Sequence, residues 1–395
     1  MFHDRFSRVL KAVDYIDEVA ALLNDTTVGL TFFAPHNKAL RAPNKESSRA
    51  LFFVDETAPV DTYDFETTLS ELEDLDCQFE SPLGDDREER KRFLKKILRA
   101  ILEYHILPRR LDVVALSDKT THPTNLSFKG AMGGRPVRIR TEQKSIPPIL
   151  VLNLYSHVVR PDMEASNGLI HVIDHPLFPP LSAFQELFMA PKYFSIFTSV
   201  IQRTGLADEL DFSYKFGDDN GEGYPEGSPA VTVFAPTNRA FDALPRDLQF
   251  FLFSPFGRRA LKKLVQYHIV PDFVLHAGQY FNFKPRLPCP EPISLLDITL
   301  PTLYEHHPLH AHIGKFKVAL PIPGDKHPYH IKTKFSVDGY EIDLADLVAL
   351  NGAIHVIDKL LDPRGPRHGY GVGHEDEVTE PWNSWQTWLP AWAET

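Results

Sequence analysis

Three short sequence blocks each occur twice in this chain, in the same order. Their letters and positions are LTFFAPHNKALR (30–41) and VTVFAPTNRAF (231–241), ILEYHILP (101–108) and LVQYHIVP (264–271), and NGLIHVID (167–174) and NGAIHVID (351–358). Ordered repetition of this kind indicates two copies of one folding unit. The repeat therefore constrains the architecture before any chemistry is considered.

The repeat predicts two domains followed by a tail. We expect the first domain in residues 1–179, the second in residues 180–363, and a tail rich in tryptophan in residues 364–395. Each domain then has a length typical of globular domains. The first copy carries an acidic insertion at about residues 42–90, and the second carries an insertion rich in histidine and proline at about residues 285–330. We expect both insertions to be surface loops, because long loops cost little closure entropy.

The composition, with 43% hydrophobic and 24% charged residues, is that of a folded protein. A formal net charge of −11 argues against a nucleic-acid partner, because phosphate binding needs clustered Lys and Arg. The two cysteines, Cys77 and Cys289, are too few for a disulfide framework or a cysteine-based zinc site. No nucleophile elbow, phosphate-binding loop or dinucleotide fingerprint occurs. We therefore expect no catalytic residues, no enzymatic activity and no cofactor.

Local patterns predict helices early in each copy and strands later, which is an α+β arrangement. Apolar residues at helical spacing predict one helix over residues 5–23 and another over residues 87–105, whose counterpart is residues 257–268. Residues 29–34 and 231–235 have the composition of buried strands. Each copy closes with an Asn-Gly turn that leads into an Ile-His-Val-Ile strand.

On these blocks the chain resembles the fasciclin-domain family, with two tandem domains covering nearly all of residues 1–363. The residues that carry the resemblance are Thr232–Asn238 with Ala240 and Phe241, the two Tyr-His pairs, and the two Asn-Gly-x-Ile-His-Val-Ile-Asp blocks. The resemblance implies a β-sandwich wedge flanked by helices in each domain. It also implies noncatalytic adhesion or scaffolding, with a protein or glycan partner, at a cell surface, in the matrix or in a vacuolar or secretory-pathway lumen.

The resemblance further implies two kinds of adhesive element in each copy. The tyrosine-histidine element falls on Tyr104, His105, Tyr267 and His268, and the Asp-Ile element, five residues before the Asn-Gly turn, falls on Asp162, Met163, Asp346 and Leu347. The chain departs from the family's pattern where Met163 and Leu347 replace isoleucine, and where His36 replaces the usual threonine. Two structural explanations stay open: a packed histidine held by a hydrogen bond, and an aspartate that caps a turn.

Other candidate sites follow from residue type alone. Four histidines gather in the second insertion, His306, His307, His310 and His312. His310 and His312 would share one face of a strand, so a surface metal site is one alternative and a solvated loop is the other. Asn24 and Asn125 fit the N-glycosylation pattern, which matters only in a secreted chain.

The tail holds all four tryptophans, Trp382, Trp385, Trp388 and Trp392. If the tail is helical they fall on one side of it, so it either docks on the second domain or lies in a membrane interface, where tryptophan is favoured. A peripheral membrane protein attached through this tail is thus one alternative to adhesion. Another is an accessory protein or enzyme that partners a secreted oxidase in small-molecule biosynthesis, a role that some fungal fasciclin proteins resemble.

The N-terminus shows no signal peptide, because the helical pattern begins almost at Met1 and leaves no room for one. We expect either a leader upstream of Met1 or no classical export.

Overall fold

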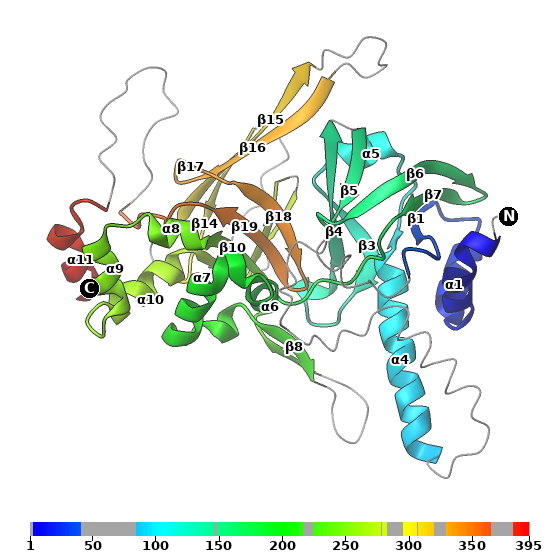
Figure 1. The fold of residues 1–395 in the computed structure, drawn as a ribbon, viewed down its shortest axis with the longest axis horizontal. Coiled ribbons are helices and arrows are strands. Elements are labelled where there is room, and N and C mark those ends of the chain that lie inside the picture. The colour runs from blue at the N-terminus through cyan, green and yellow to red at the C-terminus, as the bar shows by residue number, and fades with distance from the viewer. Residues whose placement is uncertain are drawn as a thin grey trace. The chain divides into compact units, whose positions relative to one another are not determined.

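The computed structural model describes residues 3–40, 84–145, 148–215, 224–277, 279–282, 295–305, 307–319, 329–364 and 382–394. The chain forms two compact units, unit 1 (Met1–Phe128 with Gly134–Pro180) and unit 2 (Lys129–Gly133 with Leu181–Thr395). Figure 1 shows both units and labels most of their helices and strands. Both units combine helices with mixed sheets, so both are α+β.

Unit 1 is built on one seven-stranded sheet with the strand order β2-β1-β7-β6-β5-β4-β3. Its helices are α1 (His3–Asp14), α2 (Asp17–Asn24), α4 (Gly84–Tyr104) and α5 (Val113–Ser117). A short 3₁₀ turn, η2 (Met132–Gly134), follows β3 in the chain, and its first two residues are counted with unit 2. Its strands are β1 (Leu30–Pro35), β2 (Ile106–Leu107), β3 (Thr121–Ser127), β4 (Pro136–Ser145), β5 (Pro148–Leu152), β6 (Ser156–Ala165) and β7 (Gly168–Ile173).

Unit 2 contains two four-stranded sheets, β11-β10-β19-β18 and β14-β15-β16-β17, and the hairpins β8-β9 and β12-β13. Its helices are α6 (Ala183–Phe188), α7 (Pro191–Thr204), η3 (Ala207–Glu209), α8 (Asn238–Asp242), α9 (Arg246–Phe253), α10 (Arg258–Tyr267) and α11 (Trp385–Glu394). Its strands are β8 (Phe212–Lys215), β9 (Tyr224–Gly227), β10 (Val231–Pro236), β11 (Ile269–Pro271), β12 (Phe273–His276), β13 (Gln279–Asn282), β14 (Leu295–Leu300), β15 (Leu309–Ala319), β16 (Tyr329–Val337), β17 (Tyr340–Glu341), β18 (Leu344–Ala349) and β19 (Gly352–Ile357).

The repeated blocks form the same central strands in both units. β1 runs parallel to β7 and antiparallel to β2, and β10 runs parallel to β19 and antiparallel to β11. The register is the same: Phe33 lies opposite His171, and Phe234 lies opposite His355. Both phenylalanines are fully buried. The two copies therefore share one structural core, as the repeat predicts.

The glycine of each Asn-Gly turn allows two parallel strands to approach closely. A Cβ atom on Gly168 would lie 2.0 Å from the carbonyl oxygen of Leu30, and one on Gly352 would lie 1.8 Å from that of Val231. No side chain fits at such a distance. The asparagine before each of these glycines accepts through its backbone carbonyl oxygen: Asn167 from the N–H of Leu30, the first residue of β1, and Asn351 from the N–H of Val231, the first residue of β10.

Helix packing follows the apolar periodicity of the sequence. On α4, Leu94, Leu98, Ile101 and Leu102 recur every three or four residues and are all buried. They pack with buried residues of α1 and α2 in one core cluster. In unit 2, a second cluster joins Phe234 of β10 to side chains of β14, β15 and β16, so the two four-stranded sheets share a core.

Two expectations about local structure were wrong. The helix predicted over residues 5–23 is two helices, α1 and α2, because Ile16 takes an extended backbone (φ −124°, ψ 91°) at their junction. Its side chain is buried in the core cluster that both helices share. The second insertion is not a loop in its described residues, since residues 295–300 and 309–319 form β14 and β15. With β16 they lie between the Tyr-His block and the Asn-Gly block, as β3 to β5 do in unit 1. The acidic insertion lies outside the described residues up to residue 83, and α4 begins at Gly84.

Candidate functional site

The tyrosine-histidine elements are buried in both units. Tyr104, His105, Tyr267 and His268 are each at most 1% exposed. The Nδ1 atom of His105 lies 2.7 Å from the Ile101 carbonyl oxygen, and its Nε2 accepts from the N–H of Leu177 at 2.9 Å. His268 repeats both contacts, at 2.7 Å and 3.0 Å, in unit 2.

Burial lowers the pKa of His105 and of His268 to about 4, because desolvation disfavours the imidazolium form. Both rings are therefore neutral at pH 7, with Nδ1 as donor and Nε2 as acceptor. Each joins the end of a helix, α4 or α10, to the segment just after the last strand of its unit, at Leu177 or Leu361. Direct contact between these side chains and a partner stays a prediction, and their burial favours a structural role.

Asp162 presents an exposed carboxylate at an irregular point of β6. Its backbone is left-handed (φ 53°) and lies within the register shift between Arg160 and Met163 in the β6–β7 pairing. Its N–H donates to Nδ1 of His171 at 3.2 Å, and its Oδ1 accepts from the N–H of Val113 at 3.1 Å. The side chain remains 44% exposed. Desolvation lowers the pKa of His171, so this ring is neutral at pH 7 and does not neutralise Asp162.

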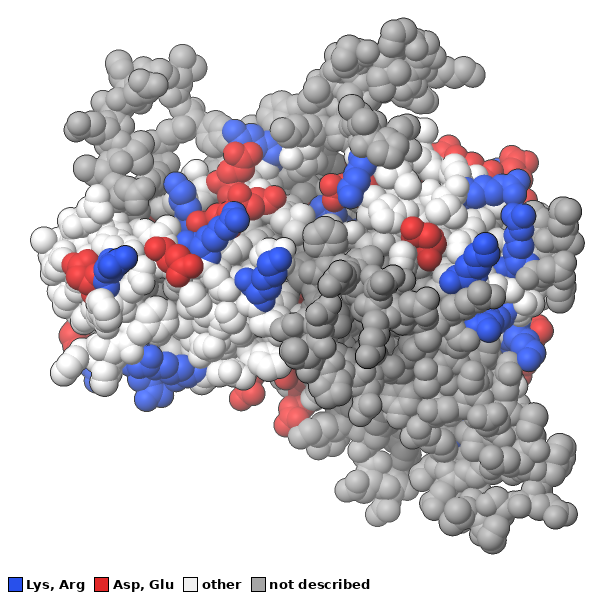
Figure 2. Space-filling view, in the orientation of Figure 1, with Lys and Arg blue, Asp and Glu red and all other residues white. Residues whose placement is uncertain are grey.

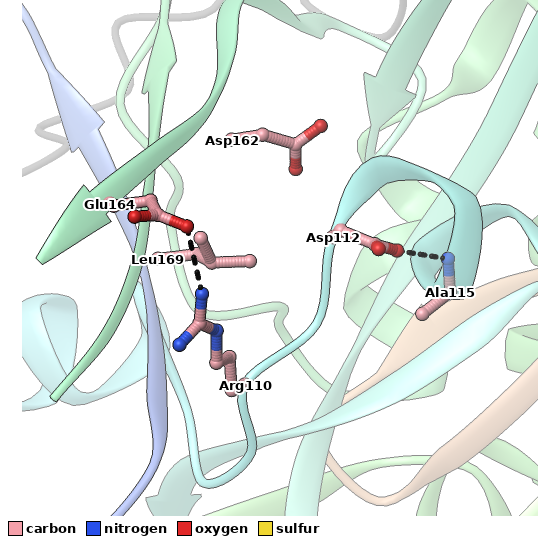
Figure 3. Close-up of a pocket in the computed structure, with 6 residues that line it drawn as sticks. All are labelled: Arg110, Asp112, Ala115, Asp162, Glu164 and Leu169. Carbon is pink, nitrogen blue, oxygen red and sulfur yellow. Dashed lines mark hydrogen bonds and ion pairs between the residues drawn. The ribbon is translucent and has the colours of Figure 1, made fainter.

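The carboxylate of Asp162 lines a pocket of about 370 Å³ in unit 1, which we call the Asp162 pocket; its residues are Arg110, Asp112, Ala115, Asp162, Glu164 and Leu169. Figure 3 shows Arg110 paired with Glu164 on one side and Asp112 turned to the N–H of Ala115 on the other. The guanidinium and Glu164 are 3.3 Å apart and both are well exposed. Three carboxylates against one guanidinium give the pocket an excess of negative charge.

On the face of the molecule drawn in Figure 2, Lys and Arg side chains lie among Asp and Glu side chains. Charge acts over only roughly 8–10 Å at physiological salt, so the groups that line the Asp162 pocket act most strongly on a ligand bound there.

The equivalent site in unit 2 is closed. Asp346 has the same left-handed backbone (φ 63°), donates its N–H to Nδ1 of His355 at 3.2 Å and accepts from the N–H of Ala277 at 2.9 Å. Its side chain is nevertheless 0% exposed, and Nδ1 of His276 lies 3.6 Å from its Oδ1. Ala277 thus corresponds to Val113, which places His276 where unit 1 has Asp112.

The remaining charged positions of the pocket are apolar in unit 2. The residue two before His276 is Val274, where unit 1 has Arg110, and the residue four before Gly352 is Val348, where unit 1 has Glu164. The second residues of the two Asp-Ile elements, Met163 and Leu347, are half-buried and pair with Ile170 and Ile354 in the sheets.

The histidine group of the second insertion is dispersed. His306 lies outside the described residues, and the ring of His307 stacks on Tyr304 with centroids 4.1 Å apart. His310 and His312 lie on β15, and Nδ1 of His312 pairs with Asp297. In the part of the chain that the structure describes, these histidines do not converge on a metal-binding group.

The two glycosylation candidates differ in accessibility. Asn24 is exposed at the end of α2, whereas Asn125 is half-buried in β3. Glycosylation at either position stays a prediction, and Asn24 is the more accessible acceptor.

The tryptophan tail packs on the rest of unit 2, where α9, α10 and α11 lie together (Figure 1). Trp382 and Trp385 are buried, and Trp388 and Trp392 are half-buried. The Trp385 ring lies 5.0 Å from that of Phe251, and its Nε1 donates to Asp247 at 3.1 Å. Lys263 donates to the Trp392 carbonyl oxygen at 2.8 Å. These contacts favour docking, and membrane contact through the tail stays a prediction. No helix in the described ranges has the length and apolar character to cross a bilayer.

Arg110, Asp112 and Glu164 were not predicted from the sequence. They lie on a loop, a helix N-cap and a strand that are up to 54 residues apart, and only the fold brings them together. An alignment of the two repeats would have given one signal of a charged site, because charged residues of the first copy stand at the positions of Val274 and Val348 in the second.

The architecture and the duplicated core agree with what comparison with known proteins finds. A model of the fasciclin domain matches residues 83–179 and 192–363, which is well over half of the chain. The chain therefore belongs to the fasciclin domain family. Its first block, residues 30–41, lies outside the match, yet β1 takes the same place in unit 1 as β10 in unit 2.

The relatives come from fungi and animals. Aurofusarin biosynthesis cluster protein S of Gibberella zeae is 28% identical over 50% of this chain and 46% of its own length. Stabilin-2 of Rattus norvegicus is 27% identical over 45% of this chain and 12% of its own length. Transforming growth factor-beta-induced protein ig-h3 of Sus scrofa is 24% identical over 59% of this chain and 26% of its own length. The chain thus spans less than half the length of each.

Among solved structures, the chain matches a FAS1 domain pair from the insect cell adhesion molecule fasciclin I. The match covers 93% of this chain and 100% of that chain, with 16% identity and a TM-score of 0.33.

Proposed function

We propose that this chain is a noncatalytic adhesion or scaffold protein that binds a protein partner through the Asp162 pocket of unit 1. We further propose that it acts at a cell surface, in the extracellular matrix or in a secretory lumen. The observation that carries the proposal is the asymmetry between the copies: Asp162 is exposed in a charged pocket, and Asp346 is buried. Membership of the fasciclin domain family supports the general class, since the family resemblance implies noncatalytic adhesion.

The pocket chemistry favours a cationic group on the partner. Arg110 pairs with Glu164, and Asp112 caps α5, so the outward carboxylate of Asp162 is the acceptor best placed for an incoming donor. A guanidinium suits this role because its planar donors can bond two carboxylate oxygens at once. A partner surface that presents an arginine is therefore the expected ligand.

An adhesion assay with charge-matched variants tests this proposal. Beads coated with the full chain are counted on cells and matrix of the producing organism. The variant D162N/E164Q removes two charges from the pocket, and the control D208N/E209Q removes two exposed charges from η3 of unit 2. We expect attachment to fall at least about tenfold for the pocket variant only, which corresponds to about 1.4 kcal/mol. Equal attachment of both variants, or no attachment of the native chain, contradicts the proposal.

A second candidate function is an accessory role in small-molecule biosynthesis. It is supported by the relative whose name assigns it to an aurofusarin biosynthesis cluster. The Asp162 pocket is also within the size range of small-molecule sites, although its lining is more polar than usual. Deleting the chain from its producing organism tests this candidate. Accumulation of an unoxidised precursor supports it, and an unchanged metabolite profile rejects it.

A further inference from the structure

Two histidines and an aspartate meet in unit 1 at the start of β6 and the end of β7. The carboxylate of Asp174 lies between the rings: its Oδ2 is 3.0 Å from Nδ1 of His157, and its Oδ1 is 2.9 Å from Nδ1 of His175. The backbone N–H of His157 also donates to Asp174 Oδ1 at 2.7 Å, which holds the carboxylate in place. One ligand atom from each residue falls in a group whose members are all within 4.8 Å of one another.

We propose that His157, Asp174 and His175 bind a divalent transition-metal ion of the Zn²⁺ type. Imidazole nitrogen and carboxylate oxygen are both zinc ligands, and each binds at about 2.0–2.2 Å. Ligand atoms around a tetrahedral zinc ion are therefore about 3.3–3.5 Å apart, which small rotations of the three side chains achieve. Three protein ligands leave one coordination position for water or a partner's side chain.

Accessibility and rigidity both suit an ion site. The three side chains are between 27% and 37% exposed, so an ion reaches them without unfolding. The strand pairing of Val158 with Ile173 fixes the adjacent residues His157 and Asp174 across the sheet. His175 is fixed in turn, because its carbonyl oxygen accepts from the Ser156 hydroxyl at 2.7 Å. The ligands therefore start near their bound positions, which lowers the entropy cost of binding.

The second copy shows that the module folds without this set. Counted from the repeated Asn-Gly-x-Ile-His-Val-Ile-Asp block, the positions of His157, Asp174 and His175 are held in unit 2 by Glu341, Asp358 and Lys359. Unit 2 thus keeps the aspartate, whose Oδ1 accepts from the Thr237 hydroxyl at 2.6 Å, and lacks both imidazoles. A lysine ammonium is not a metal ligand at neutral pH. The proposed site belongs to unit 1 alone.

Isothermal titration calorimetry of the full chain with zinc tests the proposal. The variant H157E/H175K places the residues of unit 2 in unit 1, so it is expected to fold; its metal-free melting temperature checks this. The control H310Q/H312Q removes two histidines of β15 instead. We expect one zinc site in the native chain and the control, weakened at least about tenfold in H157E/H175K.

Cobalt supplies a second readout, because four-coordinate Co²⁺ absorbs strongly in the visible range. We expect the native chain and the β15 control to give this band and H157E/H175K to lose it. The proposal is overturned if the native chain binds neither ion, or if H157E/H175K folds and binds both as the native chain does.

Discussion

Asp162 and Asp346 occupy the same place in the two copies but opposite environments. Both have a left-handed backbone, and both accept from the N–H of an equivalent residue, Val113 or Ala277. The Asp162 side chain is 44% exposed beside Arg110 and Glu164, and that of Asp346 is 0% exposed beside His276. One element of the duplicated module is thus open in unit 1 and part of the core in unit 2.

This difference predicts unequal effects of the same substitution. Asparagine tolerates a left-handed backbone, so D162N and D346N change charge without adding strain. We expect D346N to lower the free energy of unfolding by about 1–3 kcal/mol, because the amide that replaces the buried carboxylate is a weaker acceptor for the N–H of Ala277. D162N should change it by less than about 0.5 kcal/mol. Urea unfolding of both variants measures this, and equal effects would show that the two sites do not differ in burial.

The buried histidines predict a loss of stability in mild acid. Burial lowers the pKa of His105 and His268 to about 4 from the ordinary value of 6.5. Between these values the unfolded chain binds protons that the folded chain does not. Their contribution is therefore fully present above pH 6.5 and falls by about 1.4 kcal/mol per histidine for each pH unit between 6.5 and 4.

Unfolding experiments at several pH values from 4.5 to 7 measure this slope. The variants H105Q and H268Q serve as controls, since each removes one titrating histidine and leaves all other titrating groups in place. Each variant should show a shallower pH dependence than the native chain. A slope unchanged in both variants would mean that these rings protonate in the folded state.

The Asn-Gly glycines predict a matched pair of destabilising substitutions. G168A and G352A each place a Cβ atom within 2.0 Å of a backbone oxygen, so β1 must move away from β7, or β10 from β19. We expect each to cost at least about 3 kcal/mol. G29A is the control, because its Cβ atom would lie 3.6 Å from the Arg110 side chain, an ordinary contact. Thermal melts that show G168A or G352A as stable as G29A would contradict the close strand approach.

The docked tail predicts a specific fluorescence change. All four tryptophans lie in residues 382–392, so intrinsic tryptophan emission reports on the tail alone. W385A removes the ring that packs on Phe251 and should weaken the docked state by about 3 kcal/mol. We expect the emission of the other three to shift to longer wavelength, and the exposed control N383A to leave it unchanged. No shift for W385A would mean that Trp385 does not anchor the tail.

Much of the core could be predicted because its signals are local. Apolar spacing in residues 87–105 predicts α4, and the repeated blocks predict β1, β7, β10 and β19. Both predictions succeed because helices and strands each have a characteristic spacing of apolar residues along the sequence. The break at Ile16 could not be predicted, because it depends on burying that side chain in a core formed with residues far along the chain, such as those of α4.

The site was predicted only in part, for a related reason. The repeats predict the same role for Asp162 and Asp346. Their exposure depends on the side chains around them, including residues far away in sequence such as Arg110 in unit 1 and Val274 in unit 2. The cluster of His157 with Asp174 and His175 likewise depends on strand pairing across the β6–β7 turn. Local patterns predict elements, whereas the chemistry of these sites arises where elements meet.

The most direct test of an open site in unit 1 and a closed one in unit 2 is a nuclear magnetic resonance titration. The isotopically labelled full chain is titrated with N-acetyl-arginine amide, and with the neutral citrulline analogue as a control. We expect saturable changes in the chemical shifts of the Val113 and Asp162 backbone amides with the arginine probe only, and no changes at Ala277 and Asp346. Equal shifts in both units, or no shift at Val113 and Asp162, would contradict this expectation.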